Sequence, residues 1–153
     1  MNTIIREYNK SDKVGCVESF KSNVPKYFTE EEINDFENFL LRIEKEDNKT
    51  HFYVVEYYSK IIGCGGFGDK DNTGIISLAW GLIHSNYHKK GFGKMLLLHR
   101  LEQIKLHKPA SPVVIDTTQY SYEFFEKYGF STTKITKDYY TTGMHRYDMI
   151  NGY

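Results

Sequence analysis

The sequence predicts an α/β sandwich built on one mixed β-sheet. This prediction rests on the spacing of the apolar residues. Short β-prone stretches and longer stretches with helical spacing follow one another in the order β-α-α-β-β-β-α-β-α-β-β. Residues 75–116 pass from an apolar strand through a long helix into a second apolar strand, which predicts a parallel crossover. A length of 153 residues without repeat or linker suits a single domain over residues 1–153.

The N-terminal part predicts one strand and two helices. Residues 3–8 suit a half-buried strand. Asn9 and Ser11 are both candidates to cap the helix that follows through Val14, Val17 and Phe20. Pro25 interrupts that helix, and residues 29–32 (Thr-Glu-Glu-Glu) fit a capping box for a second one. The apolar stripe that we expect to face the core consists of Ile33, Phe36, Phe39, Leu40 and Ile43.

A β-hairpin is predicted next. Residues 51–58 are β-prone, Ser59 and Lys60 form the turn, and residues 61–67 return as a strand. Glycine weakens a strand, so several glycines in one strand need an explanation. Either a neighbouring backbone crowds the strand or a ligand comes close to it, and the sequence is compatible with both explanations. The glycines concerned are Gly63, Gly65 and Gly66.

The C-terminal part predicts a short helix and a closing hairpin. Residues 117–119 cap the helix, which continues through Tyr128, and Gly129 ends it in the left-handed conformation. Residues 130–136 and 144–150 then pair as two strands.

Composition excludes several functions. The 20 basic and 20 acidic residues cancel, so no overall field draws the chain to nucleic acid or to an anionic membrane. No signal peptide or membrane-spanning run is present, and Cys16 and Cys64 have no metal-like or redox spacing. We therefore expect a cytoplasmic protein with reduced, partly buried thiols and no metal site.

A basic, glycine-containing turn lies between the apolar strand and the long helix. Residues 88–93 read His-Lys-Lys-Gly-Phe-Gly, and Lys94 follows. Free N–H groups at a helix start, with the positive end of the helix dipole, suit a phosphate or diphosphate. The alternative is an ordinary turn with solvated lysines. The dinucleotide-binding pattern is absent, because Leu96 takes the position of its third glycine.

This turn resembles the acyl-CoA-binding motif of the GCN5-related N-acetyltransferase (GNAT) superfamily, Gln/Arg-x-x-Gly-x-Gly/Ala, with His88 in the first position. Residues 124–130, Phe-Phe-Glu-Lys-Tyr-Gly-Phe, resemble the family's second motif, Phe/Leu-Tyr-Glu-Lys-x-Gly-Phe, at the proper distance. The fold implied is the acyl-CoA N-acyltransferase fold. This is a mixed, mostly antiparallel sheet of six to seven strands with helices on both faces.

The resemblance implies that acetyl-CoA is the cofactor and assigns residues to it. Backbone groups of Leu82, Ile83 and His84 would pair with the pantetheine arm, in a gap between two splayed parallel strands. Thr118 stands where the family often carries an asparagine that contacts the arm. The diphosphate would be held after His88 by Lys89, Lys90, Gly91, Phe92, Gly93, Lys94 and Met95.

The catalytic assignment departs from the family. Phe125 occupies the position of the usual tyrosine acid and cannot donate a proton, although it still lines the expected cofactor site. Tyr122, with Tyr120 or Ser121 as alternatives, is the candidate replacement acid. The candidate bases are His84 and Glu56, with Asp116 behind them.

The resemblance implies direct acetyl transfer to a primary amine, on a small molecule or a peptide. The Tyr-rich residues 138–145 resemble the loop that lines the acceptor side in the family, and Tyr27 and Phe28 would border the same groove. A homodimer is left open. Other functions compatible with the sequence are an acyl-CoA-binding sensor without catalysis and, more remotely, a nucleotide-binding protein that uses the same basic turn.

Overall fold

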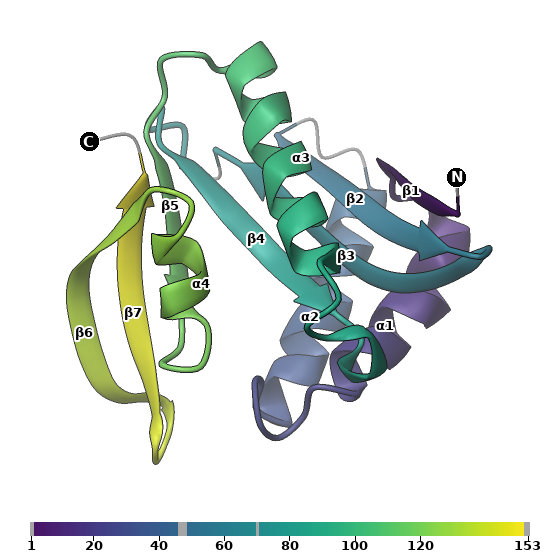
Figure 1. Cartoon of the computed structure of the whole chain (residues 1–153), viewed down its shortest axis with the longest axis horizontal. Helices are drawn as coiled ribbons and strands as arrows, with labels where there is room; N and C mark the ends of the chain where they lie inside the picture. The colour runs from purple at the N-terminus through teal and green to yellow at the C-terminus, as the bar shows by residue number, and fades with distance from the viewer. Residues whose placement is uncertain (1, 46–48, 70, 152–153) are drawn as a thin grey trace.

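The computed structural model of the chain describes residues 2–45, 49–69 and 71–151. These residues form one seven-stranded sheet in the order β1-β2-β3-β4-β5-β7-β6 (Figure 1). Its strands are β1 (Thr3–Glu7), β2 (Thr50–Tyr57), β3 (Lys60–Gly68), β4 (Ile76–Ile83), β5 (Val113–Thr117), β6 (Phe130–Thr141) and β7 (Met144–Asn151). Strands β4 and β5 are parallel, and the other neighbouring pairs are antiparallel. The predicted mixed, mostly antiparallel sheet is confirmed.

Helices cover both faces of this sheet, as predicted (Figure 1). Helices α1 (Lys13–Lys21) and α2 (Glu31–Glu44) pack on one face, and α3 (Phe92–His107) and α4 (Tyr122–Glu126) pack on the other. Successive side chains of a strand point to opposite faces. Accordingly, Val54 of β2 is buried with α1 and α2, whereas the next residue, Val55, is buried with α3.

Capping side chains lie just ahead of both N-terminal helices. Asn9 caps a 3₁₀ turn, Lys10–Asp12, that leads into α1, and its side chain accepts a hydrogen bond from the N–H of Ser11 at 3.0 Å. Before α2, the N–H of Thr29 donates to Glu32 Oε1 at 2.9 Å, and the N–H of Glu32 donates to Thr29 Oγ1 at 3.3 Å. These reciprocal bonds confirm the predicted capping box.

Two turns differ from the prediction. The β2–β3 hairpin turns at Tyr58 and Ser59, one residue early, and both have positive φ angles, 47° and 65°, as a two-residue hairpin turn with matching twist requires. Helix α4 begins only at Tyr122, because Thr118 Oγ1 accepts the N–H of Tyr120 at 3.2 Å and closes a turn ahead of the helix. Gly129, with φ of 92°, is left-handed as predicted.

The C-terminal hairpin is longer than predicted. Strand β6 runs to Thr141, which pairs with Met144, so most of residues 138–143 are strand and not loop. A register shift after Thr136 and a φ of 54° at Asp138 mark an irregularity that interrupts the pairing without ending the strand. The two strands are therefore joined by a short turn and not by a long loop.

Both cysteines are free and lie fully inside the protein, whereas the sequence suggested partly buried thiols. Cys16 of α1 and Cys64 of β3 have no exposed surface. Burial raises the pKa of Cys64, and the neighbouring Cys16 adds to the effect. Both thiols are core residues.

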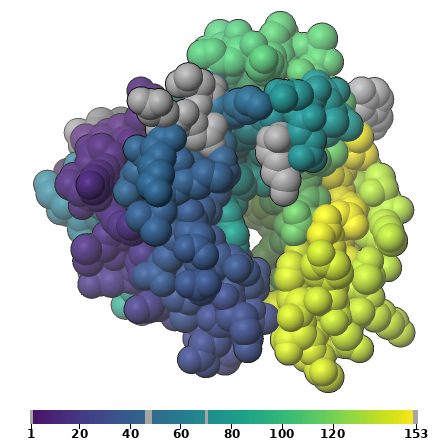
Figure 2. Space-filling view, turned by 180° about the vertical axis from the view of Figure 1, so that it is seen from behind, coloured from purple at the N-terminus to yellow at the C-terminus, as the bar shows by residue number. Residues whose placement is uncertain are grey.

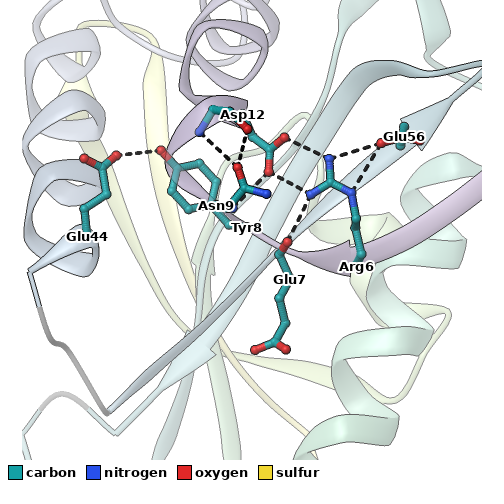
Figure 3. A network of polar contacts seen from close by, with 8 residues as sticks. Arg6, Glu7, Tyr8, Asn9, Asp12, Glu44 and Glu56 are labelled. Atoms are coloured by element: carbon teal, nitrogen blue, oxygen red, sulfur yellow. Dashed lines mark hydrogen bonds and ion pairs between the residues drawn. The ribbon is translucent and has the colours of Figure 1, made fainter.

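An ion network joins β1, β2 and the start of α1 (Figure 3). The guanidinium of Arg6 donates to both carboxylate oxygens of Asp12 at 2.8 Å and to Glu56 at 3.1 Å. Asp12 is only 5% exposed. The hydrogen bonds from Arg6 hold the pKa of Asp12 below its usual value, although burial opposes them.

Asp12→Asn is expected to lower the free energy of unfolding at pH 7 by about 2 kcal/mol, the size of hydrogen bonds to a charged group. The folded pKa of Asp12 lies below the unfolded one. The carboxylate therefore stabilises the fold above the unfolded pKa of about 4, and this is lost as the pH falls through the folded pKa. Urea denaturation at pH 7 and pH 3 should show the difference between the two proteins shrinking. Asp71→Asn, an exposed carboxylate, is the control, and an equal deficit at both pH values would contradict the account.

Candidate functional site

A gap opens between the two parallel strands. Strands β4 and β5 pair only at their starts, with Ile76 opposite Val113 and Ser77 opposite Val114. Beyond Ser77 the strands diverge (Figure 1), and β4 continues to Ile83 without pairing to β5. Backbone groups of β4 on this side are therefore available to a ligand rather than to the neighbouring strand.

A bulge lies in the part of β4 that borders the gap. Cys64 pairs with Leu82 and Gly66 with Ala79, so Trp80 and Gly81 together oppose the single residue Gly65. Trp80 has a φ of 48°, a strained value for a bulky residue. Its ring packs against four phenylalanines of the helical layer, Phe20, Phe28, Phe36 and Phe39. This packing holds the bulge in place.

The glycines of β3 are explained by crowding. A Cβ on Gly66 would lie 2.0 Å from the carbonyl oxygen of His51, and one on Gly63 would lie 2.7 Å from that of Leu82. Of the two alternatives, the crowded strand is the one that the structure supports.

The end of β4 is fixed by side chains from elsewhere. The carbonyl oxygen of Ile83 accepts hydrogen bonds from Asn23 Nδ2 at 2.9 Å and from His88 Nε2 at 2.8 Å. Asn23 follows α1 and is 4% exposed. Of the Ile83 backbone, only the N–H is thus left for a pantetheine arm. No local sequence pattern points to Asn23, because its partner lies sixty residues away.

His84 does not fit the roles predicted for it. Its N–H donates to the carbonyl of Ile62 at 2.7 Å, and its carbonyl accepts from the N–H of Tyr87 at 2.9 Å, so its backbone is already paired. Its ring Nδ1 accepts the N–H of Asn86 at 3.1 Å. Burial, with help from Lys60, lowers the pKa of the imidazole, so it is neutral with its proton on Nε2. The lone pair that a base needs is therefore engaged in a turn.

The other predicted bases are also engaged. Glu56 is bonded to Arg6, and β3 and β4 separate its strand from β5. Asp116, at the end of β5, accepts a hydrogen bond from Tyr140 at 2.5 Å and lies 4.0 Å from Arg146. Each of the three side chains predicted as a base, His84, Glu56 and Asp116, thus already has a hydrogen-bond partner within the protein.

The tyrosines near Phe125 have different surroundings. Phe125 is 8% exposed and packs against Phe130 in the core. Tyr122, the predicted acid, is stacked on Tyr147 of β7 with ring centres 4.3 Å apart. Tyr120 is half-exposed, and its ring meets that of Tyr27 edge-on at 5.8 Å.

Aromatic rings span the gap from one side to the other. The ring of Tyr27, from the loop before α2, contacts that of Tyr120 after β5, and it also contacts the ring of His88 at 5.3 Å. His88 in turn bonds to the end of β4. The structure thus brings together His88 and the tyrosine that follows β5, but neither Glu56 nor Tyr122 joins them.

The start of α3 is open to a ligand. Gly91 has a φ of 88°, and a Cβ built on it would have no atom within 4 Å. The helix ladder begins with the N–H of Met95, which donates to the carbonyl of Gly91 at 3.1 Å. Met95 is therefore removed from the predicted cradle, and the outward N–H groups are those of Phe92, Gly93 and Lys94.

These features fit coenzyme A. The exposed side chains of Lys89, Lys90 and Lys94 surround the helix start, which suits a diphosphate. Beside it, β4 is not paired to β5 beyond Ser77, so its backbone groups on that side can form hydrogen bonds with a ligand. Thr118, predicted to contact the pantetheine arm, is buried in the loop after β5, and its Oγ1 accepts the N–H of Tyr120.

A second hollow lies between α2 and the C-terminal hairpin, seen in Figure 2 between the blue and the yellow surfaces. It is a pocket of about 450 Å³ with an acidic wall, because Glu31, Glu32 and Asp35 line it. Burial raises the pKa of Glu32. The opposite wall comes from Tyr139, Tyr140 and Thr141, in the segment predicted to line the acceptor side.

Metal and membrane features are not found in the part of the chain that the structure describes. Within residues 2–45, 49–69 and 71–151, no three His, Cys, Asp or Glu side chains are grouped to hold a metal ion. No described helix is long and apolar enough to span a membrane.

Comparison with known proteins agrees with this geometry. The model of the acetyltransferase (GNAT) domain family matches residues 16–150. No curated protein matches the sequence.

Solved structures share the fold over nearly the whole chain. A GNAT-family protein from Desulfovibrio desulfuricans has a TM-score of 0.82 at 19% identity, with 97% of each chain covered. The PaiA N-acetyltransferase from Thermoplasma acidophilum, in complex with coenzyme A, has a TM-score of 0.74 at 22% identity over 100% of both chains. The ribosomal-protein-S18-alanine N-acetyltransferase from Escherichia coli has 0.77 at 12% identity, covering 97% of this chain and 92% of its own. Because the family model covers most of its length, the chain belongs to the GNAT acetyltransferase family.

Proposed function

We propose that this chain transfers the acetyl group of acetyl-CoA directly to a primary amine, with both substrates bound together. The observation that carries the proposal is the gap between β4 and β5, which lies beside the open start of α3. A sheet gains backbone hydrogen bonds when neighbouring strands stay paired, so strands that part require another reason.

The residues of α3 bind the donor. The N–H groups of Phe92, Gly93 and Lys94 donate to the diphosphate, and the exposed lysines add positive charge. The free edge of β4 orients the pantetheine arm. When bound, acetyl-CoA supplies an activated acyl group. The N–H of Ile83, whose carbonyl is already bonded to Asn23 and His88, is held rigidly at the edge of the gap.

The transfer requires that protons move in both directions. The amine nitrogen forms a bond to the acyl carbon while the carbon–sulfur bond breaks, so the amine loses a proton and the sulfur gains one. His84, Glu56 and Asp116 already form hydrogen bonds with other residues. The amine proton therefore leaves through water in the pocket between α2 and the C-terminal hairpin. The hydroxyl of Tyr120 is the donor that replaces the missing tyrosine at Phe125.

The acidic pocket supports an amine as acceptor. Glu31, Glu32 and Asp35 attract an alkylammonium group, which is the form of a primary amine that predominates at neutral pH. The pocket is open and partly walled by tyrosines, so a small molecule or the end of a peptide both fit its chemistry.

A turnover screen tests the proposal. Purified protein is incubated with acetyl-CoA and a panel of small-molecule and peptide amines, and release of the coenzyme A thiol is followed. We expect release above the amine-free control with at least one member, together with an acetylated product by mass spectrometry. Binding of acetyl-CoA without release over the whole panel would instead favour the non-catalytic sensor. Competition by ATP or NAD would favour nucleotide binding.

A further inference from the structure

Arg100, in the middle of α3, is a buried cation without an acidic partner. It is 3% exposed, and the one hydrogen bond that it makes within the described residues is long, 3.4 Å from Nη1 to the carbonyl oxygen of Gly66. Its Nε is buried and has no hydrogen-bond partner. Among the described residues, no carboxylate forms an ion pair with it.

The guanidinium lies against the bulge of β4. A Cβ on Gly81 would lie 2.7 Å from Nη2 of Arg100, and one on Gly65 would lie 3.3 Å from its Cζ. Residues 65 and 81 face each other across the bulge, so glycine at both positions makes the space that this side chain occupies. The positive charge is therefore held behind the stretch of β4 that borders the gap.

Stability alone does not account for this arrangement. An ion that is removed from water without a partner destabilises a fold, and replacing a buried ion by an apolar side chain of similar volume is often neutral or stabilising. The site lies among apolar core residues, with Leu96 and Leu97 on the same helix. A methionine would fill the space without the electrostatic cost.

We infer that Arg100 is a positioning residue whose positive charge, held behind Gly81, favours the thiolate form of coenzyme A in the gap. The inference rests on the proposed function, because it places the sulfur beside β4. Only one strand of backbone would separate the sulfur from the guanidinium, and opposite charges at such range favour each other in a poorly solvated site. The residue would act through the β4 backbone and would not touch the substrate.

Few other charges bear on this site. Burial lowers the pKa of Arg100 to about 10, so it stays positive at neutral pH. The titratable neighbours that interact with it are Cys64 of β3 and His99 of α3. Burial raises the pKa of Cys64 and lowers that of His99, so both are neutral just above pH 7.

The test is a titration of the bound thiol. The ultraviolet absorbance of the thiolate is followed with pH for the complex with coenzyme A. The same titration with desulfo-coenzyme A is subtracted to remove the protein's own cysteines. We expect Arg100→Met to raise the midpoint by about one pH unit, whereas Arg100→Lys stays near the wild type. The melting temperature of Arg100→Met should equal or exceed that of the wild type.

The outcomes are distinct. Equal midpoints in the wild type and Arg100→Met would overturn the inference while leaving the proposed function intact. Failure of the wild type to bind coenzyme A would overturn both. If Arg100→Met does not fold, Arg100→Gln replaces it, because this variant removes the charge but keeps hydrogen-bonding groups. Its midpoint is then compared with that of the wild type, and equal midpoints would again overturn the inference.

Discussion

Gly91→Val is expected to weaken acetyl-CoA binding by at least about 100-fold, because it disturbs the start of α3 at the point where the diphosphate is held. Losing one or two hydrogen bonds to a charged group, at about 1.5–3 kcal/mol each, accounts for this factor. Valine does not adopt the φ of 88° without strain, so the outward N–H groups move. The added side chain also stands where the ligand approaches, a space that is empty of protein atoms. Isothermal titration calorimetry measures the effect.

A second glycine provides a matched control for this variant. Gly74 has a φ of 82°, and a Cβ on it would likewise have no atom within 4 Å, but it precedes β4 at the end away from α3. Gly74→Val therefore introduces the same strain and should bind acetyl-CoA as the wild type does. Equal loss of affinity in both variants would show that strain, and not the helix start, is responsible.

Phe20→Ala is expected to lower the free energy of unfolding by about 3–5 kcal/mol, the usual range for removing a buried phenylalanine. Phe20 has no exposed surface, and its ring stacks on Phe28 at 4.4 Å and on Phe36 at 4.8 Å. It also supports Trp80 at the bulge of β4. A cavity here loosens the whole helical layer, and urea denaturation measures the loss.

Val14 provides the control for this prediction, because it lies on the same helix and is 70% exposed. Val14→Ala should change the stability by less than about 0.5 kcal/mol. A loss below about 1 kcal/mol for Phe20→Ala would mean that the stacked rings do not hold α1 and α2 on the sheet.

Features that depend on neighbouring residues could be predicted from the sequence. The order of strands and helices follows from apolar spacing, and the parallel pair follows from the strand–helix–strand run between Ile76 and Thr117. The open start of α3 follows from Gly91 and the lysines around it. These are local signals, because backbone preference and helix geometry act over a few residues.

Features that depend on residues far apart in the chain could not be predicted from the sequence. Nothing near Glu56 shows that Arg6 binds it, and the hydrogen bond from Asn23 to Ile83 joins residues sixty positions apart. The glycines of β3 signalled a close approach, but only the fold shows that Arg100 fills part of that space. The sequence predicts a shorter β6 than the structure has, because the irregular backbone at Asp138 resembles a turn.

The most direct test of the account is a crystal structure of the protein with coenzyme A. We expect the diphosphate to accept hydrogen bonds from the N–H groups of Phe92, Gly93 and Lys94. We also expect the pantetheine arm to lie between β4 and β5 with its sulfur beside the bulge at Gly81. Coenzyme A bound elsewhere, or a gap that stays empty at saturating concentration, would contradict it.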